Sequence, residues 1–138
     1  MKRLLLALLF ALSSSSLFAA RPEPQAQIDA FFATLGEKGA AAAIDGLCKG
    51  TFLEAQKGPQ ITALTPQFDA ALKIYGKITR IEKVDTKPYG ESFVRHRLIS
   101  YHANGAPLFW DFMFYRAQGE WQVYVFRFND QFDKVFAY

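Results

Sequence analysis

The sequence contains a single cysteine, Cys48, and only two histidines among its 138 residues. One cysteine cannot close an internal disulfide, so the folded chain must depend on packing for its stability. The histidines, His96 and His102, have no metal-ligand spacing with each other or with a cysteine or glutamate. Phosphate-binding glycine loops and nucleophile-elbow motifs are also missing. We therefore assign no metal site, expect no cofactor and assign no catalytic residue from motifs.

An excess of one charge is also missing once the N-terminus is set aside. The 16 basic and 13 acidic residues give a net charge of +3. Lys2 and Arg3 are two of the 16, which leaves 14 basic residues against 13 acidic ones in the rest of the chain. These charges are mixed in sign and form no basic run. We therefore expect no nucleic-acid partner.

The apolar run at the N-terminus is too short to span a bilayer, which takes about 20 residues. It covers residues 4–12, follows the basic Lys2-Arg3 pair, and is followed by serines and the small residues Ala19 and Ala20. A basic start, a short apolar stretch and a small-residue end are the three parts of a secretory signal peptide. The sequence predicts a signal peptide at residues 1–19, cleaved near Ala19. It therefore predicts a periplasmic or secreted protein without a stable membrane anchor.

Helical and strand periodicities occupy separate parts of the remaining chain, which is long enough for one domain. Apolar residues recur at helical spacing in three segments, namely 25–38, 40–49 and 66–76, with Gly58-Pro59 expected to form a loop. From Lys77 onward, β-branched and aromatic residues fill four runs, and Asn104-Gly105 is a strong hairpin signal. The sequence predicts one α+β domain at residues 25–138, with three N-terminal helices packed on a four-stranded antiparallel sheet.

Aromatic residues are abundant, with 14 Phe, 6 Tyr and 2 Trp, and most of them fall in the last two predicted strands. A sheet that is apolar on both faces has both covered, or uses one for a ligand or an oligomer. Turns centred on Asn104-Gly105 and Gln118-Gly119 place Arg97 opposite Phe112 and Trp110 opposite Arg127. A slip of one residue or a β-bulge would exchange the two faces.

In this register, two arginines stand beside an aromatic wall. Guanidinium groups bind carboxylates and phosphates through paired hydrogen bonds, so such a face suits an anionic ligand. The predicted ligand-binding residues are Arg97, Trp110, Phe112 and Arg127. The alternative is that the arginines lie toward the sheet edge and pair with Glu82 and Asp85.

The order of elements and two aromatic segments resemble the nuclear transport factor 2-like (NTF2-like) superfamily. The resemblance rests on the residues 75–78 (YGKI), 109–115 (FWDFMFY) and 119–123 (GEWQV), and it covers roughly residues 25–130. It implies a cystatin-like α+β cone, in which a curved sheet wraps the helices, in an exported bacterial member. The superfamily includes ketosteroid-isomerase-like and dehydratase-like enzymes, ligand-binding modules and exported proteins without assigned activity. Dimerisation through the outer face of the sheet is common among its members.

The enzymes of this superfamily imply a carboxylate base in the cone, opposite a hydrogen-bond donor. Asp111 is the one carboxylate within an aromatic strand, and the predicted register places it on the same face as His96, turned away from the cavity. Asp111 and His96 are therefore the alternative acid–base pair. Asp29, Asp45 and Asp69 lie on predicted helices, at positions that suit solvated faces.

We expect an exported, non-catalytic module that binds a small anionic or apolar ligand or a protein partner, as a homodimer through the sheet. The alternative is a small lyase or isomerase that uses a carboxylate in the cone. The direction of Asp111 separates the two, because an enclosed pocket favours the enzyme and an open face favours the module. Cys48 is expected to be buried on a helix, and its alternative roles are an intermolecular bridge or a reactive thiol.

Overall fold

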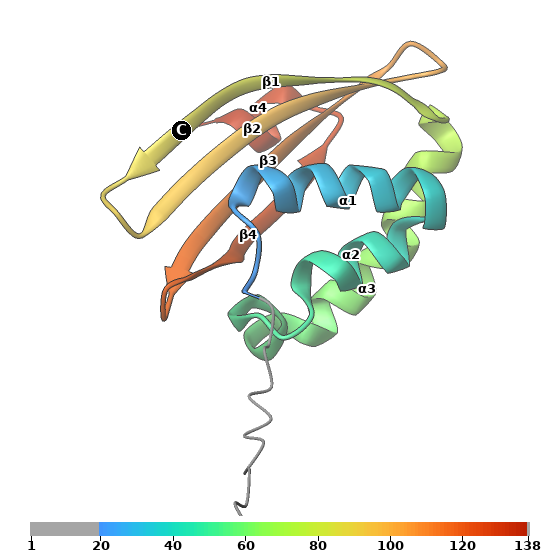
Figure 1. Cartoon of the computed structure of the whole chain (residues 1–138). Helices are drawn as coiled ribbons and strands as arrows, with labels where there is room; N and C mark the ends of the chain where they lie inside the picture. Colours follow the sequence, from blue (N-terminus) through green and yellow to red (C-terminus); the bar gives the residue numbers. More distant parts are fainter. Residues whose placement is uncertain (1–19, 138) are drawn as a thin grey trace, which may run out of the picture.

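The computed structural model describes residues 20–137 (Figure 1). The predicted signal peptide at residues 1–19 lies outside the described residues. Three helices come first, α1 (Pro24–Lys38), α2 (Ala40–Cys48) and α3 (Phe52–Tyr75). Four strands follow, and a short helix comes last: β1 (Ile78–Tyr89), β2 (Phe93–His102), β3 (Pro107–Ala117), β4 (Glu120–Asn129) and α4 (Phe132–Phe136). Within the described range, no helix is long and apolar enough to cross a membrane.

The strands form one antiparallel sheet in the order β1-β2-β3-β4. The sheet curves around α1, with α2 and α3 beyond it, and the predicted α+β class is confirmed (Figure 1). We call the face of the sheet turned toward α1 the inner face and the opposite one the outer face. Helix α4, which the sequence did not indicate, lies against the outer face, where Phe136 contacts Phe109 of β3.

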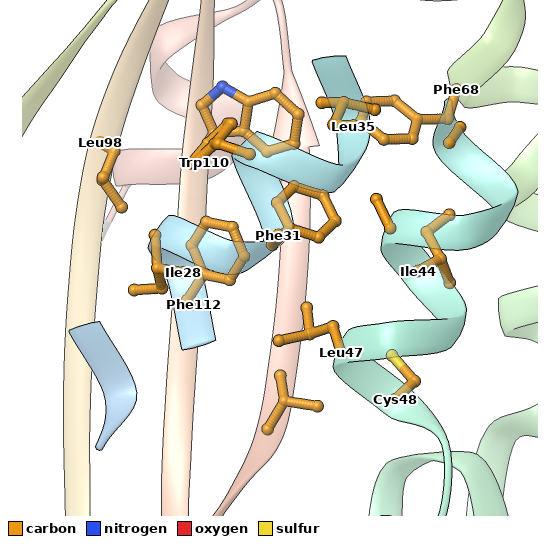
Figure 2. Packing of buried hydrophobic residues seen from close by; sticks show 14 of the residues in the cluster. Ile28, Phe31, Leu35, Ile44, Leu47, Cys48, Phe68, Leu98, Trp110 and Phe112 are labelled. Atoms are coloured by element: carbon orange, nitrogen blue, oxygen red, sulfur yellow. The ribbon is translucent and has the colours of Figure 1, made fainter. Parts of the chain in front are cut away.

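The core lies between α1, α2 and the inner face. Helix α1 begins at Pro24, a position where the missing N–H of proline has no partner to lose. Its buried residues Ile28, Phe31, Phe32 and Leu35 recur at helical spacing. The ring of Phe31 lies 5.9 Å from that of Trp110 and 5.6 Å from that of Phe112, both edge to face (Figure 2). Helix α2 closes the cluster with the buried residues Ile44, Leu47 and Cys48.

Helix α3 begins earlier than the sequence predicted. Thr51 caps it, with its Oγ1 accepting a hydrogen bond from the backbone N–H of Glu54 at 3.3 Å. Gly58-Pro59 does not form the expected loop. It follows a kink at Lys57, whose φ of −134° joins two helical segments, so Pro59 falls in the first turn of the second segment, where proline is tolerated. Pro66, predicted as the start of the helix, lies inside it.

The pairing of β2 with β3 differs by one residue from the predicted register. Arg97 pairs with Asp111, and Trp110 pairs with Leu98. The cause is the turn, because the N–H of Gly105 donates to the carbonyl of His102 at 2.8 Å, which centres the turn one residue earlier than predicted. Gly105 then follows the turn at a φ of 87°, as in a type I turn with a glycine bulge.

This shift of one residue regroups the side chains of the sheet, because neighbours along a strand point to opposite faces. Trp110, Phe112 and Phe114 of β3 lie on the inner face, and Arg95, Arg97 and Arg127 lie on the outer face. Strand β1 extends past the helices, and ten of its twelve residues are exposed. The inner face is therefore covered at its centre and open along β1.

Candidate functional site

The structure separates the four residues that the sequence predicted to bind a ligand. Trp110 and Phe112 are fully buried in the core, in contact with Phe31. Arg97 and Arg127 lie on the other side of the sheet, where both are cross-strand partners of Asp111. The shared cavity predicted for the four side chains is therefore wrong, because the register behind it is off by one residue.

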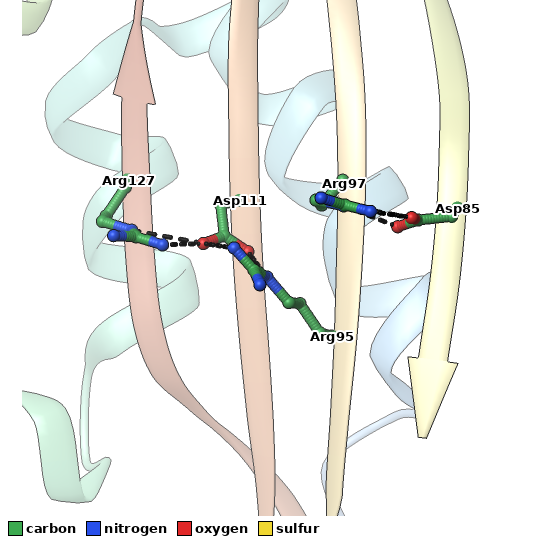
Figure 3. Close-up of polar contacts among 5 residues, drawn as sticks. All are labelled: Asp85, Arg95, Arg97, Asp111 and Arg127. Carbon is green, nitrogen blue, oxygen red and sulfur yellow. Dashed lines mark hydrogen bonds and ion pairs between the residues drawn. The ribbon is translucent and has the colours of Figure 1, made fainter. Parts of the chain in front are cut away.

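The arginines of the outer face bind carboxylates of the chain itself (Figure 3). Asp111 accepts two hydrogen bonds from Arg95, at 2.8 and 3.0 Å, and further hydrogen bonds from Arg127. Arg97 donates to Asp85 at 2.9 Å, and this contact lowers the pKa of the Asp85 carboxyl. The pairing of Arg97 with Asp85 was the alternative left open by the sequence.

The two alternative acid–base residues lie on opposite faces. His96 pairs with the inward-facing Phe112 and is only 4% exposed, whereas Asp111 faces outward. The Nδ1 atom of His96 lies 3.1 Å from the hydroxyl of Thr86, and burial lowers the pKa of this histidine. Asp111 and His96 cannot act together on one substrate.

A second histidine contacts a serine in the core. The Oγ atom of Ser100 lies 2.9 Å from Nε2 of His102, whose Nδ1 lies 2.8 Å from the carbonyl of Gly76. Ser100 is fully buried and also accepts a hydrogen bond from the indole of Trp110 at 2.7 Å. No substrate reaches this serine, so we interpret the pair as part of the core. Among residues 20–137, no three histidine, cysteine, aspartate or glutamate side chains are placed to hold a metal ion.

A groove of about 790 Å³ lies between α1 and the inner face of β1 and β2. Its floor is apolar and consists of Phe32, Leu35, Leu72, Ile78 and Leu98. The groove exists because no helix covers β1, so Ile81 remains 40% exposed beside it. The sequence analysis missed this site. The sequence did contain a signal for it. Ile81 and Lys83 are two residues apart and therefore point to the same face of the first strand, and no predicted helix was available to cover that face.

The charged side chains that line the groove are one carboxylate, Asp29, and three cations, Lys77, Arg80 and Lys83. Asp29, on α1, accepts a hydrogen bond from Gln25 at 2.8 Å. Lys83, on β1, pairs with the inward-facing Leu98 and has no hydrogen bond or ion pair with any residue in the described part of the chain. Arg80, the next cation along β1, is already paired with Glu82 at 2.9 Å. Lys83 is therefore a cation on the inner face of β1 that is open to a ligand.

The architecture is that of the NTF2-like fold, in which a sheet curves around a long N-terminal helix and leaves an open groove. Among solved structures, the chain is similar to a protein from Campylobacter jejuni that is described as an NTF2-like transpeptidase. The TM-score is 0.57 with 12% sequence identity, over 75% of this chain and 99% of that one. This likeness shows the NTF2-like fold, so the fold implied by the resemblance is confirmed. No protein-family model and no curated protein match the sequence.

Proposed function

We propose that this chain is a non-catalytic module that binds a small amphipathic ligand in the groove between α1 and β1. The groove itself carries the proposal. Its volume of about 790 Å³ lies within the range of small-molecule sites, and apolar lining with a few polar groups is typical of them. The apolar body of the ligand would lie on Leu35 and Leu98, and an anionic group would meet Lys83.

The distribution of carboxylates favours a binding module over a lyase or isomerase. Asp111 faces away from the groove and is held by two arginines, so it is not placed as a base. Asp29 does line the groove, but it is exposed and already accepts a hydrogen bond from Gln25. A catalytic carboxylate in this fold needs a site shielded from water, in which its proton affinity is tuned.

The cysteine thiol and the serine that contacts a histidine, two groups of the kind that acyl transfer uses, are both buried. Cys48 is 2% exposed, and burial raises the pKa of its thiol to about 12. It lies on α2, away from the groove, and Ser100 is sealed in the core. The description of the Campylobacter jejuni protein as a transpeptidase therefore finds no support in the residues of this groove.

Binding is tested by calorimetric titration with decanoate, and with decanol as its uncharged counterpart. Wild-type protein should bind both, and decanoate more tightly. Lys83→Gln should weaken decanoate about two- to fivefold and leave decanol unchanged, because an exposed ion pair contributes about 0.2–1 kcal/mol. Lys87→Gln is the matched control, since Lys87 lies on the same strand over the ring of Tyr89.

A second variant tests the apolar floor separately from the charge. Ile81→Ser removes a partly exposed side chain from the groove and should weaken both ligands, with little effect on folding. Absence of saturable binding of either compound by the wild type would contradict the proposal. The proposal would also be contradicted if Lys83→Gln changed the affinity for decanoate no more than Lys87→Gln did. In that case the charge of Lys83 would not contact the ligand.

A further inference from the structure

A second cavity lies at the N-terminal end of α1, separated from the groove by Gln25, which lines both. Its volume is about 320 Å³. It is bounded by the start of α1, the hairpin between β1 and β2, and Trp121 at the start of β4. Its apolar walls include Pro24, Pro88 and Val94. The proposed ligand of the groove does not account for this cavity.

Two buried polar atoms lack a hydrogen-bond partner in the described part of the chain, and the residues of both line this cavity. They are Oε1 of Gln25, an acceptor, and Nε1 of Trp121, a donor. A buried polar atom without a partner costs about 1–3 kcal/mol, so each such atom in a native structure calls for an explanation. A donor and an acceptor at one cavity point to a shared occupant.

The contacts around both side chains restrict their movement. The amide of Gln25 is fixed by its Nε2, which donates to Asp29 at 2.8 Å, and a flip would turn two acceptors toward each other. The backbone of Trp121 is held by Gln27, which donates to its carbonyl at 2.8 Å. The indole ring is 9% exposed and packs under the guanidinium of Arg116, 4.5 Å from its centre.

We propose that this cavity binds a neutral amide group, either a peptide bond or a carboxamide. The carbonyl oxygen of the ligand accepts from the indole N–H of Trp121, and its N–H donates to Oε1 of Gln25. An amide carries an acceptor and a donor on adjacent atoms, which point in opposite directions in a trans peptide bond, whereas a carboxylate has no donor and an ammonium group has no acceptor. The apolar walls suit the small side chain that flanks a peptide bond.

The charges around the cavity also favour a neutral ligand over an anion. The acidic residues that line it are Glu23 and Glu91, and both are exposed. Like charges at a binding surface discourage a partner, so a carboxylate is disfavoured here. The cavity thereby differs from the groove, where Lys83 stands at the rim.

A water molecule is the simplest rival occupant, because ordered waters commonly satisfy buried polar groups. A water molecule occupies about 30 Å³ of liquid, so the cavity has room for a ligand several times larger. The test must therefore separate an amide from water. It must also separate this cavity from the groove, so that failure of one proposal leaves the other standing.

The test is a nuclear magnetic resonance titration that follows the two indole N–H signals of the protein. N-acetylalanine methylamide is the probe. The signal of Trp121 should shift and saturate, whereas that of Trp110, whose N–H is bound to Ser100, should stay in place. N-acetylalanine methyl ester, which replaces one N–H by oxygen, should bind about three- to tenfold more weakly, and acetate should not bind.

Variants then test the two orphaned atoms one at a time. Trp121→Phe keeps the ring and removes the donor, and Gln25→Leu removes the acceptor. Each should weaken the methylamide about three- to tenfold, while Lys83→Gln should not affect it. An unshifted Trp121 signal would show that water alone fills the cavity and would overturn the proposal. An equal shift of the Trp121 signal by acetate and by the methylamide would also overturn the proposal. Both titrations use wild-type protein, so this result does not depend on whether a variant folds.

Discussion

At the scale of single residues, the most demanding position is Asp111. Its carboxylate is 1% exposed although it lies on the outer face, because the side chains of Arg95 and Arg127 cover it. A charge removed from water needs compensating charges and hydrogen bonds, and two guanidinium groups supply them here. We therefore interpret this cluster as a structural feature that holds β2, β3 and β4 together.

Replacing the buried carboxylate should reduce stability far more than replacing the exposed one. Asp111→Asn should lower the free energy of unfolding by about 3 kcal/mol, the low end for a broken buried ion pair, because Arg127 is half exposed. Asp85→Asn is the matched control on the same face. Its side chain is 35% exposed, so the loss should stay below about 1 kcal/mol. Urea unfolding of both variants checks this, and equal losses would contradict the interpretation.

The residue scale also shows how far the sequence could lead to the site. The pairing of Arg97 with Asp85 was open to prediction, because the charges occur on neighbouring strands. The placement of Arg97 and Trp110 on opposite faces could not be predicted, because it depends on a shift of one residue in the turn. Lys83 was missed for another reason. Lys83 is a candidate because it has no ion-pair partner in the described part of the chain. Only the arrangement of the helices around β1 shows this.

At the scale of elements, the turns and helix ends decided which predictions held. The Asn104-Gly105 signal correctly located a hairpin, but glycine at a positive φ fits more than one turn type, and each type sets a different register. The two prolines in α3 misled the prediction in a similar way. Pro59 suggested a loop and Pro66 a helix start, yet the Thr51 cap begins the helix well before both. Local signals locate such features more reliably than they define their geometry.

Helix α4 provides a test of packing on the outer face, because its two phenylalanines differ in exposure. Phe136 is 3% exposed, and its ring contacts Phe109 and the guanidinium of Arg97. Phe136→Ala should therefore lower the free energy of unfolding by about 3 kcal/mol. Phe132 is 54% exposed on the same helix, so Phe132→Ala should cost well under about 1 kcal/mol. Equal effects in urea unfolding would show that α4 does not dock on the sheet in solution.

At the scale of the whole molecule, the fold was predictable because it depends on patterns that span many residues. Separate helical and strand periodicities determine the α+β class, and one misplaced turn does not change them. The site depends on what the fold leaves uncovered. The groove exists because β1 extends beyond the helices. The second cavity exists because Gln25 and Trp121, which are far apart in the sequence, both line it.

We propose that two copies of the chain associate through the outer face of the sheet. Helix α4 covers one end of this face and leaves an aromatic cluster at the other, made of Phe93, Tyr115 and Tyr124, with Tyr124 40% exposed. Exposed aromatic groups of this kind are enriched at protein interfaces. Light scattering should therefore give twice the mass of one chain at micromolar concentration.

The position of the contact and the role of Cys48 can be tested in the same measurement. Tyr124→Lys should shift the mass to that of one chain, because it places a charge in the centre of the proposed interface. Ile74→Lys is the control, since Ile74 is 69% exposed on α3 beside the turn between β2 and β3, at the opposite end of these strands from the cluster. Reductant should have no effect, because Cys48 is buried and the pKa of its thiol is raised to about 12. Wild-type protein that is monomeric would contradict the proposal. A dimer lost only in reductant would instead assign the contact to a bridge between two Cys48 thiols, which would require α2 to open.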